Sequence, residues 1–136
     1  MQPYQNQDFE ITANTLNGHA LVSVKGTLDG WHYQMLEESL RREISPDREA
    51  IIVDLTELKF ASIGGMYALV EALRSVQYDI KLYVIAKGDV LRVIHRTRFD
   101  LRVNICRSLN EASTLLLPYD SGAASRLLYP CSEDDG

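Results

Sequence analysis

The sequence predicts an α/β fold: a mixed, mostly parallel β-sheet with an N-terminal antiparallel hairpin and about four α-helices. Two observations predict it. Segments with strand-like and helical hydrophobic patterns alternate along the chain, which is typical of a parallel sheet with right-handed crossovers. The dipeptide Asn17-Gly18 separates the first two strand-like segments, and Asn-Gly in that position is a strong signal for a two-residue hairpin turn.

The hairpin and a helix occupy the first part of the chain. Apolar residues alternate with polar ones at Phe9, Ile11 and Ala13, and the return strand covers residues 20–26. Apolar residues then recur at helical spacing, at Trp31, Met35, Leu36, Leu40 and Ile44. The pattern predicts a helix over 31–44 that ends before Pro46, because the residue before a proline avoids the α region.

A central strand and a second helix come next. Residues 50–55 are apolar on both faces, as expected of a strand that is covered on both sides, and residues 56–61 are expected to form a loop. One broad helical stripe follows, at Ile63, Met66, Tyr67, Leu69, Val70, Leu73 and Val76. Ser62 precedes this stripe and is a candidate N-cap.

The remaining elements are shorter. Residues 80–86 predict a strand, and Gly88-Asp89 offers a turn and an N-cap for a helix with apolar Val90, Leu91, Val93 and Ile94. A short final strand is expected around 103–105. Ser108 and Glu111 have the spacing of a capping box, in which each side chain satisfies a free backbone N–H at the start of the last helix.

The length of 136 residues is typical of one domain. We expect a flexible leader at residues 1–7, one domain at 8–117, and a flexible tail at 118–136 that begins where Pro118 stops the last helix. The acidic tail contains an apolar group, Leu127-Leu128-Tyr129. This group could pack back on the domain or bind something else.

Composition narrows the class of protein. The chain is 46% hydrophobic and 24% charged, which is typical of a globular protein. Its net charge is −5 and it has no strong Lys/Arg cluster, so no nucleic-acid partner is expected. The uncharged N-terminus is not a signal peptide, and no apolar run approaches the roughly 20 residues that span a bilayer. We therefore expect a cytoplasmic protein without direct membrane insertion.

Catalytic and metal-binding patterns are weak. Cys106 and Cys131 are too few for a disulfide scaffold or a multi-cysteine zinc site. His19, His32 and His95 lie at no ligand spacing and are expected on the surface or at helix edges. Gly64-Gly65 resembles a fragment of a phosphate-binding loop but lacks that loop's other glycines and its lysine. We expect a protein that is not an enzyme and that needs no metal or cofactor.

Several segments, in order and spacing, resemble the STAS domain family, the anti-sigma factor antagonists. The resemblance covers roughly residues 8–117. It is carried by Gly26-Thr27-Leu28-Asp29, by Val53-Asp54-Leu55 with Phe60 and the small-residue turn after it, by residues 81–85 and 90–94, and by Ser108-Leu109-Asn110-Glu111-Ala112. The family's order of elements is also the order expected here.

The resemblance implies regulation by protein–protein contact. Members of the family bind an anti-sigma factor of the serine-kinase type and thereby free a sigma factor. Carried over to this chain, the partner-binding residues are Asp29, Gly30, Trp31, Ser62, Ile63, Gly64, Gly65 and Met66. In phosphorylatable members, phosphate on a serine at the start of the second helix adds negative charge to the docking surface and abolishes binding.

This sequence departs from the family at that serine. An ungapped alignment places Ile63 on the phosphorylated serine and Gly65 on the family's glycine. Ile63 has no hydroxyl, so one hypothesis is a docking module that phosphate does not switch at this turn, with Ile63 as an exposed apolar contact or as core. The other hypothesis shifts the alignment by one residue and makes Ser62 a displaced acceptor.

Other roles remain open at this point. The family also serves as a subunit of other assemblies, such as lipid-transport machinery or signalling complexes, and a weak nucleotide-binding domain is a further alternative at Gly64-Gly65. The edge strands and the apolar helix tip could support a homodimer.

Overall fold

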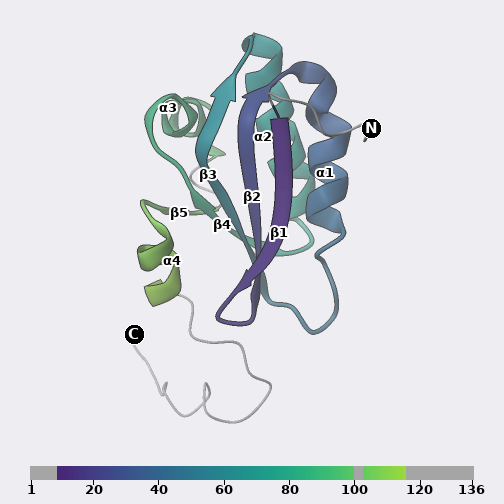
Figure 1. The fold of residues 1–136 in the computed structure, drawn as a ribbon, viewed down its shortest axis with the longest axis vertical. Coiled ribbons are helices and arrows are strands. Elements are labelled where there is room, and N and C mark those ends of the chain that lie inside the picture. Colours follow the sequence, from purple (N-terminus) through teal and green to yellow (C-terminus); the bar gives the residue numbers. More distant parts are fainter. Residues whose placement is uncertain (1–8, 100–102, 116–136) are drawn as a thin grey trace.

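The computed structural model describes residues 9–99 and 103–115 and shows a five-stranded sheet with helices on both faces (Figure 1). The strands lie in the order β1-β2-β3-β4-β5. They are β1 Phe9–Leu16, β2 His19–Leu28, β3 Ala50–Phe60, β4 Lys81–Ile85 and β5 Asn104–Cys106. β1 and β2 are antiparallel and every other pair is parallel, which confirms the predicted fold class.

The helices connect these strands. They are the 3₁₀ helix η1 Gly30–His32 and the α-helices α1 Tyr33–Arg41, α2 Ile63–Gln77, α3 Gly88–Arg96 and α4 Leu109–Leu115. The predicted leader at 1–7 and the tail at 118–136, with Pro118, lie outside the described residues.

The hairpin forms at the predicted dipeptide. Asn17 has a φ of 55° and Gly18 a φ of 82°, so both turn residues are left-handed, as the tight hairpin turn requires. The register then runs without interruption from Leu16 opposite His19 to Phe9 opposite Gly26.

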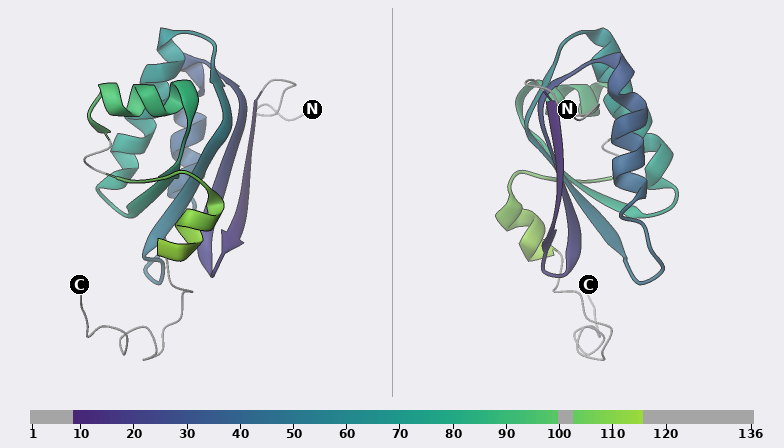
Figure 2. Two further views of the ribbon diagram at one scale, coloured as in Figure 1. Left: turned by 90° about the vertical axis from the view of Figure 1, so that its left-hand side faces the viewer. Right: turned by 45° about the vertical axis from the view of Figure 1, so that its right-hand side comes forward.

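The sheet separates two apolar layers (Figure 2). The main core lies between one face of the sheet and helices α1, α2 and α3, and it includes fully buried Leu28, Leu36 and Leu69. On the other face, α4 packs through Ala112 onto a smaller cluster: Ala50, Ile52, Ile85 and Cys106. Central β3 is therefore buried from both sides, which explains its apolar sequence.

β3 is longer than predicted, because residues 56–60 continue the strand instead of forming a loop. A register shift separates the pairs Ser23–Asp54 and Lys25–Glu57. The Asp54 carboxylate accepts hydrogen bonds from the Thr56 backbone N–H (3.0 Å) and hydroxyl (2.8 Å). This local turn absorbs the extra residue, and the strand resumes pairing with β2 as far as Phe60.

Three helix starts differ in detail from the prediction. The expected helix over 31–44 is split into η1 and a shorter α1. Helix α3 begins at Gly88 with Lys87 as its N-cap, so Asp89 lies inside the first turn. Before α4, the Ser108 hydroxyl accepts the Glu111 N–H, but Glu111 accepts the N–H of Arg107 (2.6 Å), one residue before the position that a standard capping box uses.

A polar clamp holds α1 against the C-terminal half of α2. The Arg41 guanidinium donates to Glu37, to Asp79 and to both the hydroxyl and the carbonyl of Ser75. The Ser75 hydroxyl donates to Glu37 at 2.5 Å, and hydrogen bonds from Ser75 and Arg41 hold the pKa of Glu37 below its usual value. Arg41 therefore links the end of α1 to the C-terminal end of α2.

Candidate functional site

The ends of β2 and β3 bring the two predicted partner-binding segments together. The Leu28 carbonyl, at the end of β2, accepts the Ala61 N–H at 3.0 Å. Beyond this bond, Gly30 in η1 faces Gly64 in α2, with only 3.4 Å between an ideal Cβ on Gly30 and the Gly64 carbonyl oxygen. Residues 29–31 and 62–66 thus lie together at the N-terminus of α2, where Gly65 is buried and the other residues are exposed or half-buried.

Gly65 is required for the close approach of α2 to the end of β2. A Cβ built on Gly65 would lie 2.0 Å from the Leu28 carbonyl oxygen, far inside van der Waals contact. Its N–H donates to the Ser62 carbonyl (3.0 Å). Gly65 therefore has a packing role that accounts for a glycine at this position without a phosphate ligand.

The surface carries exposed apolar side chains. Trp31 and Ile63 are each 66% exposed, Tyr67 is 65% exposed, and Met66 is half-buried. We call these four residues the apolar tip. Of the two alternatives left open for Ile63, the structure shows the exposed one, and Tyr67 also lies outside the buried face of α2, which begins at Gly65 and continues through Ala68.

Tyr67 is the surface residue that sequence reasoning missed. It lies four positions after Ile63, on the same side of α2, so an outward Ile63 implies an outward Tyr67. Trp31 was expected both in a helix over 31–44 and among the partner-binding residues; it lies in η1 and is mostly exposed.

Ser62 occupies the predicted N-cap position, with an extended φ of −165°. Its side chain makes no capping hydrogen bond, and the residue is exposed. The helix start is instead closed by the Ser62 carbonyl, which accepts the N–H groups of Gly65 and Met66.

His32 is buried beneath the apolar tip. Its ring stacks on Phe9 at a centroid distance of 4.0 Å and packs against Trp31 at 3.9 Å. Its Nδ1 accepts the Asp29 N–H at 2.8 Å, so His32 ties Trp31 to the start of the loop. Burial lowers the pKa of His32 below its usual 6.5, although the charge of Asp29 opposes this shift.

The histidine prediction is therefore wrong in part. His32 and His19 are both 3% exposed, so neither is on the surface. His19 lies in β2, whereas His32 does lie at a helix edge, between η1 and α1. The residues that neighbour His19 and His32 in the sequence gave no sign that these two side chains are buried.

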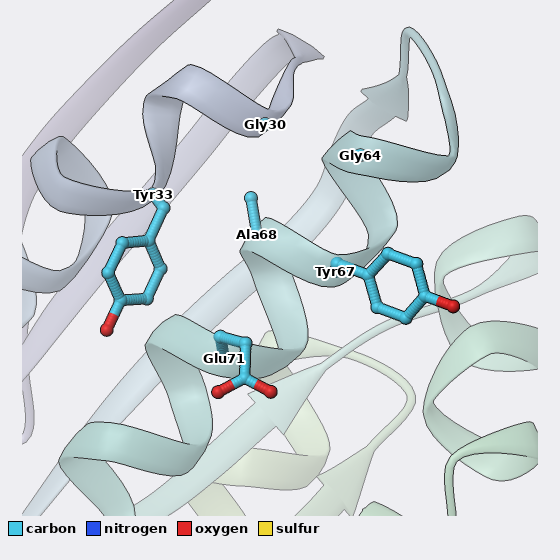
Figure 3. Close-up of a pocket in the computed structure, with 6 residues that line it drawn as sticks. All are labelled: Gly30, Tyr33, Gly64, Tyr67, Ala68 and Glu71. Atoms are coloured by element: carbon cyan, nitrogen blue, oxygen red, sulfur yellow. The ribbon is translucent and has the colours of Figure 1, made fainter.

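Tyr67 separates two grooves. On one side, a groove of about 260 Å³ between α1 and α2 is lined by Gly30, Tyr33, Gly64, Tyr67, Ala68 and Glu71 (Figure 3). In this view the Tyr67 ring points away from Tyr33. On the other side, a groove of about 300 Å³ lies between α2 and α3 and is lined by Ile63, Met66, Tyr67, Val70, Val93, Arg96 and Thr97.

Within residues 9–99 and 103–115, no group of three His, Cys, Asp or Glu side chains is arranged to hold a metal ion. In the same described residues, no helix is long and apolar enough to cross a membrane. The described surface offers apolar contact area at the apolar tip.

The element order and sheet topology define a class of fold: small mixed α/β domains with an antiparallel hairpin leading into a parallel sheet. The chain belongs to the STAS domain family, whose family model matches residues 10–112. This confirms the resemblance inferred from the sequence.

Named relatives agree with this assignment. The chain is 27% identical over 105 residues to the anti-sigma-F factor antagonist RsfB of Mycobacterium tuberculosis, covering 76% of this chain and 86% of RsfB. A crystal structure of an anti-sigma factor antagonist from Mycobacterium paratuberculosis matches with a TM-score of 0.64 and 22% identity, over 84% of this chain and 96% of that one. Phosphorylated SpoIIAA of Bacillus matches with a TM-score of 0.52 and 10% identity, over 79% and 99% of the two chains. The protein is thus an anti-sigma factor antagonist-like STAS domain.

Proposed function

We propose that this protein is a non-catalytic, cytoplasmic regulator that binds an anti-sigma factor of the serine-kinase type through its apolar tip. The observation that carries the proposal is the exposure of Trp31, Ile63 and Tyr67 in the two segments that meet at the N-terminus of α2. Exposed apolar patches of this kind mark interaction sites. The names of the relatives supply the class of partner.

The backbone of η1 and of the start of α2 suits a docking role because internal contacts hold it in place before binding. Gly65 seats α2 against the Leu28 carbonyl, and His32 holds the η1 loop. Little backbone ordering is therefore needed on association, and preorganisation of this kind favours affinity. Aromatic anchors such as Trp and Tyr dominate many interfaces, each costing about 2 kcal/mol or more when truncated.

Phosphate does not switch binding at Ile63 in this proposal, because its side chain has no hydroxyl. Incubation with the partner kinase and ATP, followed by intact-mass measurement, should add no phosphate to the protein. Stoichiometric phosphorylation mapped to Ser62 would instead establish the displaced acceptor. In that case Ser62→Asp should weaken partner binding strongly, since it introduces charge beside the apolar tip.

Co-isolation with mass spectrometry tests the partner class. We expect the tagged wild-type protein to retain an anti-sigma factor, Ile63→Asp to lose it, and Tyr78→Asp to retain it. Tyr78 is a matched control because it is 70% exposed at the C-terminal end of the same helix. Retention of a membrane-transport ATPase in place of an anti-sigma factor would overturn the proposal and favour a lipid-transport subunit.

A further inference from the structure

We propose that the chain's own segment 127–135 docks in the groove between α2 and α3. The groove is lined by apolar Ile63, Met66 and Val70 and also by the charged side chain of Arg96. The segment carries groups complementary to both: apolar Leu127-Leu128-Tyr129, followed after a short interval by acidic Glu133-Asp134-Asp135. This assigns an occupant to a groove that shares Ile63, Met66 and Tyr67 with the apolar tip.

Charge complementarity supports this occupant. Residues 118–136 contain four acidic residues and one arginine, a net charge of −3. The α3 segment 87–98 contains Lys87, Arg92, Arg96 and Arg98 against Asp89, a net charge of +3 with His95 neutral. Arg92 pairs with Asp89, whereas Arg96 makes no ion pair with another described residue and lines the groove.

The length of the chain also permits this contact. Leu115 ends α4, and α3 and α4 lie beside the same β5 edge on opposite faces of the sheet (Figures 1 and 2). Twelve residues lead from Leu115 to Leu127, enough to extend roughly 40 Å at about 3.3 Å per residue. A domain of this size has a radius of gyration of about 13 Å, so the segment can pass around the β5 edge. Tethering at effective concentrations on the order of millimolar lets even a weak site fill.

Occupancy would regulate the apolar tip, because Ile63, Met66 and Tyr67 belong to both the groove and the tip. A docked segment covers them and competes with a partner. This consequence rests on the proposed function. Removing the segment's anchors should tighten partner binding up to about tenfold if the groove is about 90% filled.

A spin label on Cys131 tests the contact without any partner, so its outcome is separate from that of the proposed function. Cys106 is fully buried, and burial raises the pKa of its thiol, which directs a nitroxide reagent to Cys131. We expect the methyl signals of Ile63, Met66 and Val93 to lose intensity until the nitroxide is reduced. The methyl signals of Ile52 on the opposite sheet face serve as the control.

Two full-length variants identify the determinants. Leu127→Ser/Leu128→Ser should restore the groove signals, and Arg96→Glu on the exposed end of α3 should restore them in part. Unaffected groove signals, or broadening that survives both variants, would overturn the proposal. A mixed sample distinguishes a second copy of the chain: isotope-labelled protein without nitroxide is combined with unlabelled protein that carries it. Equal broadening of the groove signals in this mixture would also overturn the proposal, because the occupant would then be a second copy.

Discussion

Substituting Gly65 by alanine tests how the site is built. In an ordinary helix, alanine is favoured over glycine by about 1 kcal/mol, so propensity alone predicts stabilisation. The structure predicts the opposite, because the new Cβ would lie 2.0 Å from the Leu28 carbonyl oxygen and 2.9 Å from its carbon. Backbone atoms cannot rotate away, so the start of α2 must withdraw from β2. Overpacking of this kind costs about 1–3 kcal/mol, and we expect a value near the upper end.

Gly64→Ala is the matched control. The Cβ at this position would lie 3.4 Å from the Ser62 hydroxyl and 3.6 Å from Gly30 Cα, which is ordinary contact. We expect the free energy of unfolding to change by less than about 1 kcal/mol. Urea unfolding followed by far-UV circular dichroism measures both variants. Equal stability of Gly65→Ala and Gly64→Ala would refute the close seating of α2 on β2.

Three further predictions concern the loop, the buried histidine and the clamp. Trp31→Ala should weaken partner binding, measured by calorimetry, by about 2–4 kcal/mol. The free energy of unfolding should stay within about 1 kcal/mol of wild type, because Trp31 is mostly exposed. Since burial holds the folded pKa of His32 below 6.5, the unfolded chain binds its proton first, so stability should decline as pH falls below 6.5 and the loss should be complete below the folded pKa. His32→Asn should show a smaller decline between pH 7.5 and 5.5 in urea unfolding; an identical decline would contradict this role. Arg41→Ala should lower the free energy of unfolding by about 1 kcal/mol and leave partner affinity unchanged.

The order of elements could be predicted because local signals and tertiary structure agree. The left-handed turn at Asn17-Gly18 and the doubly covered strand at 50–55 each have a local cause that is legible in the sequence. The extension of β3 was not predictable in the same way. It depends on pairing with β2 and on the turn at Asp54, and neither follows from the hydrophobicity of residues 56–60.

The site was predictable as two segments but not as a surface. Small residues and the family resemblance indicated residues 29–31 and 62–66, and their contact arises from the parallel ends of β2 and β3. The hydrophobic pattern placed Trp31 and Tyr67 in helical apolar stripes, and such a periodic pattern cannot distinguish an apolar residue that packs inward from one that is exposed for binding. The burial of His32 depends on stacking with Phe9, a contact between residues far apart in the chain.

Partner affinity measured for three proteins tests the central claim most directly: wild type, Ile63→Asp and Tyr78→Asp, each titrated into the purified anti-sigma factor. A charge buried at the centre of an apolar contact is costly, so Ile63→Asp should weaken binding by about 100-fold or more and Tyr78→Asp should match wild type. Equal affinity for Ile63→Asp and wild type would contradict the assignment of the apolar tip as the docking surface.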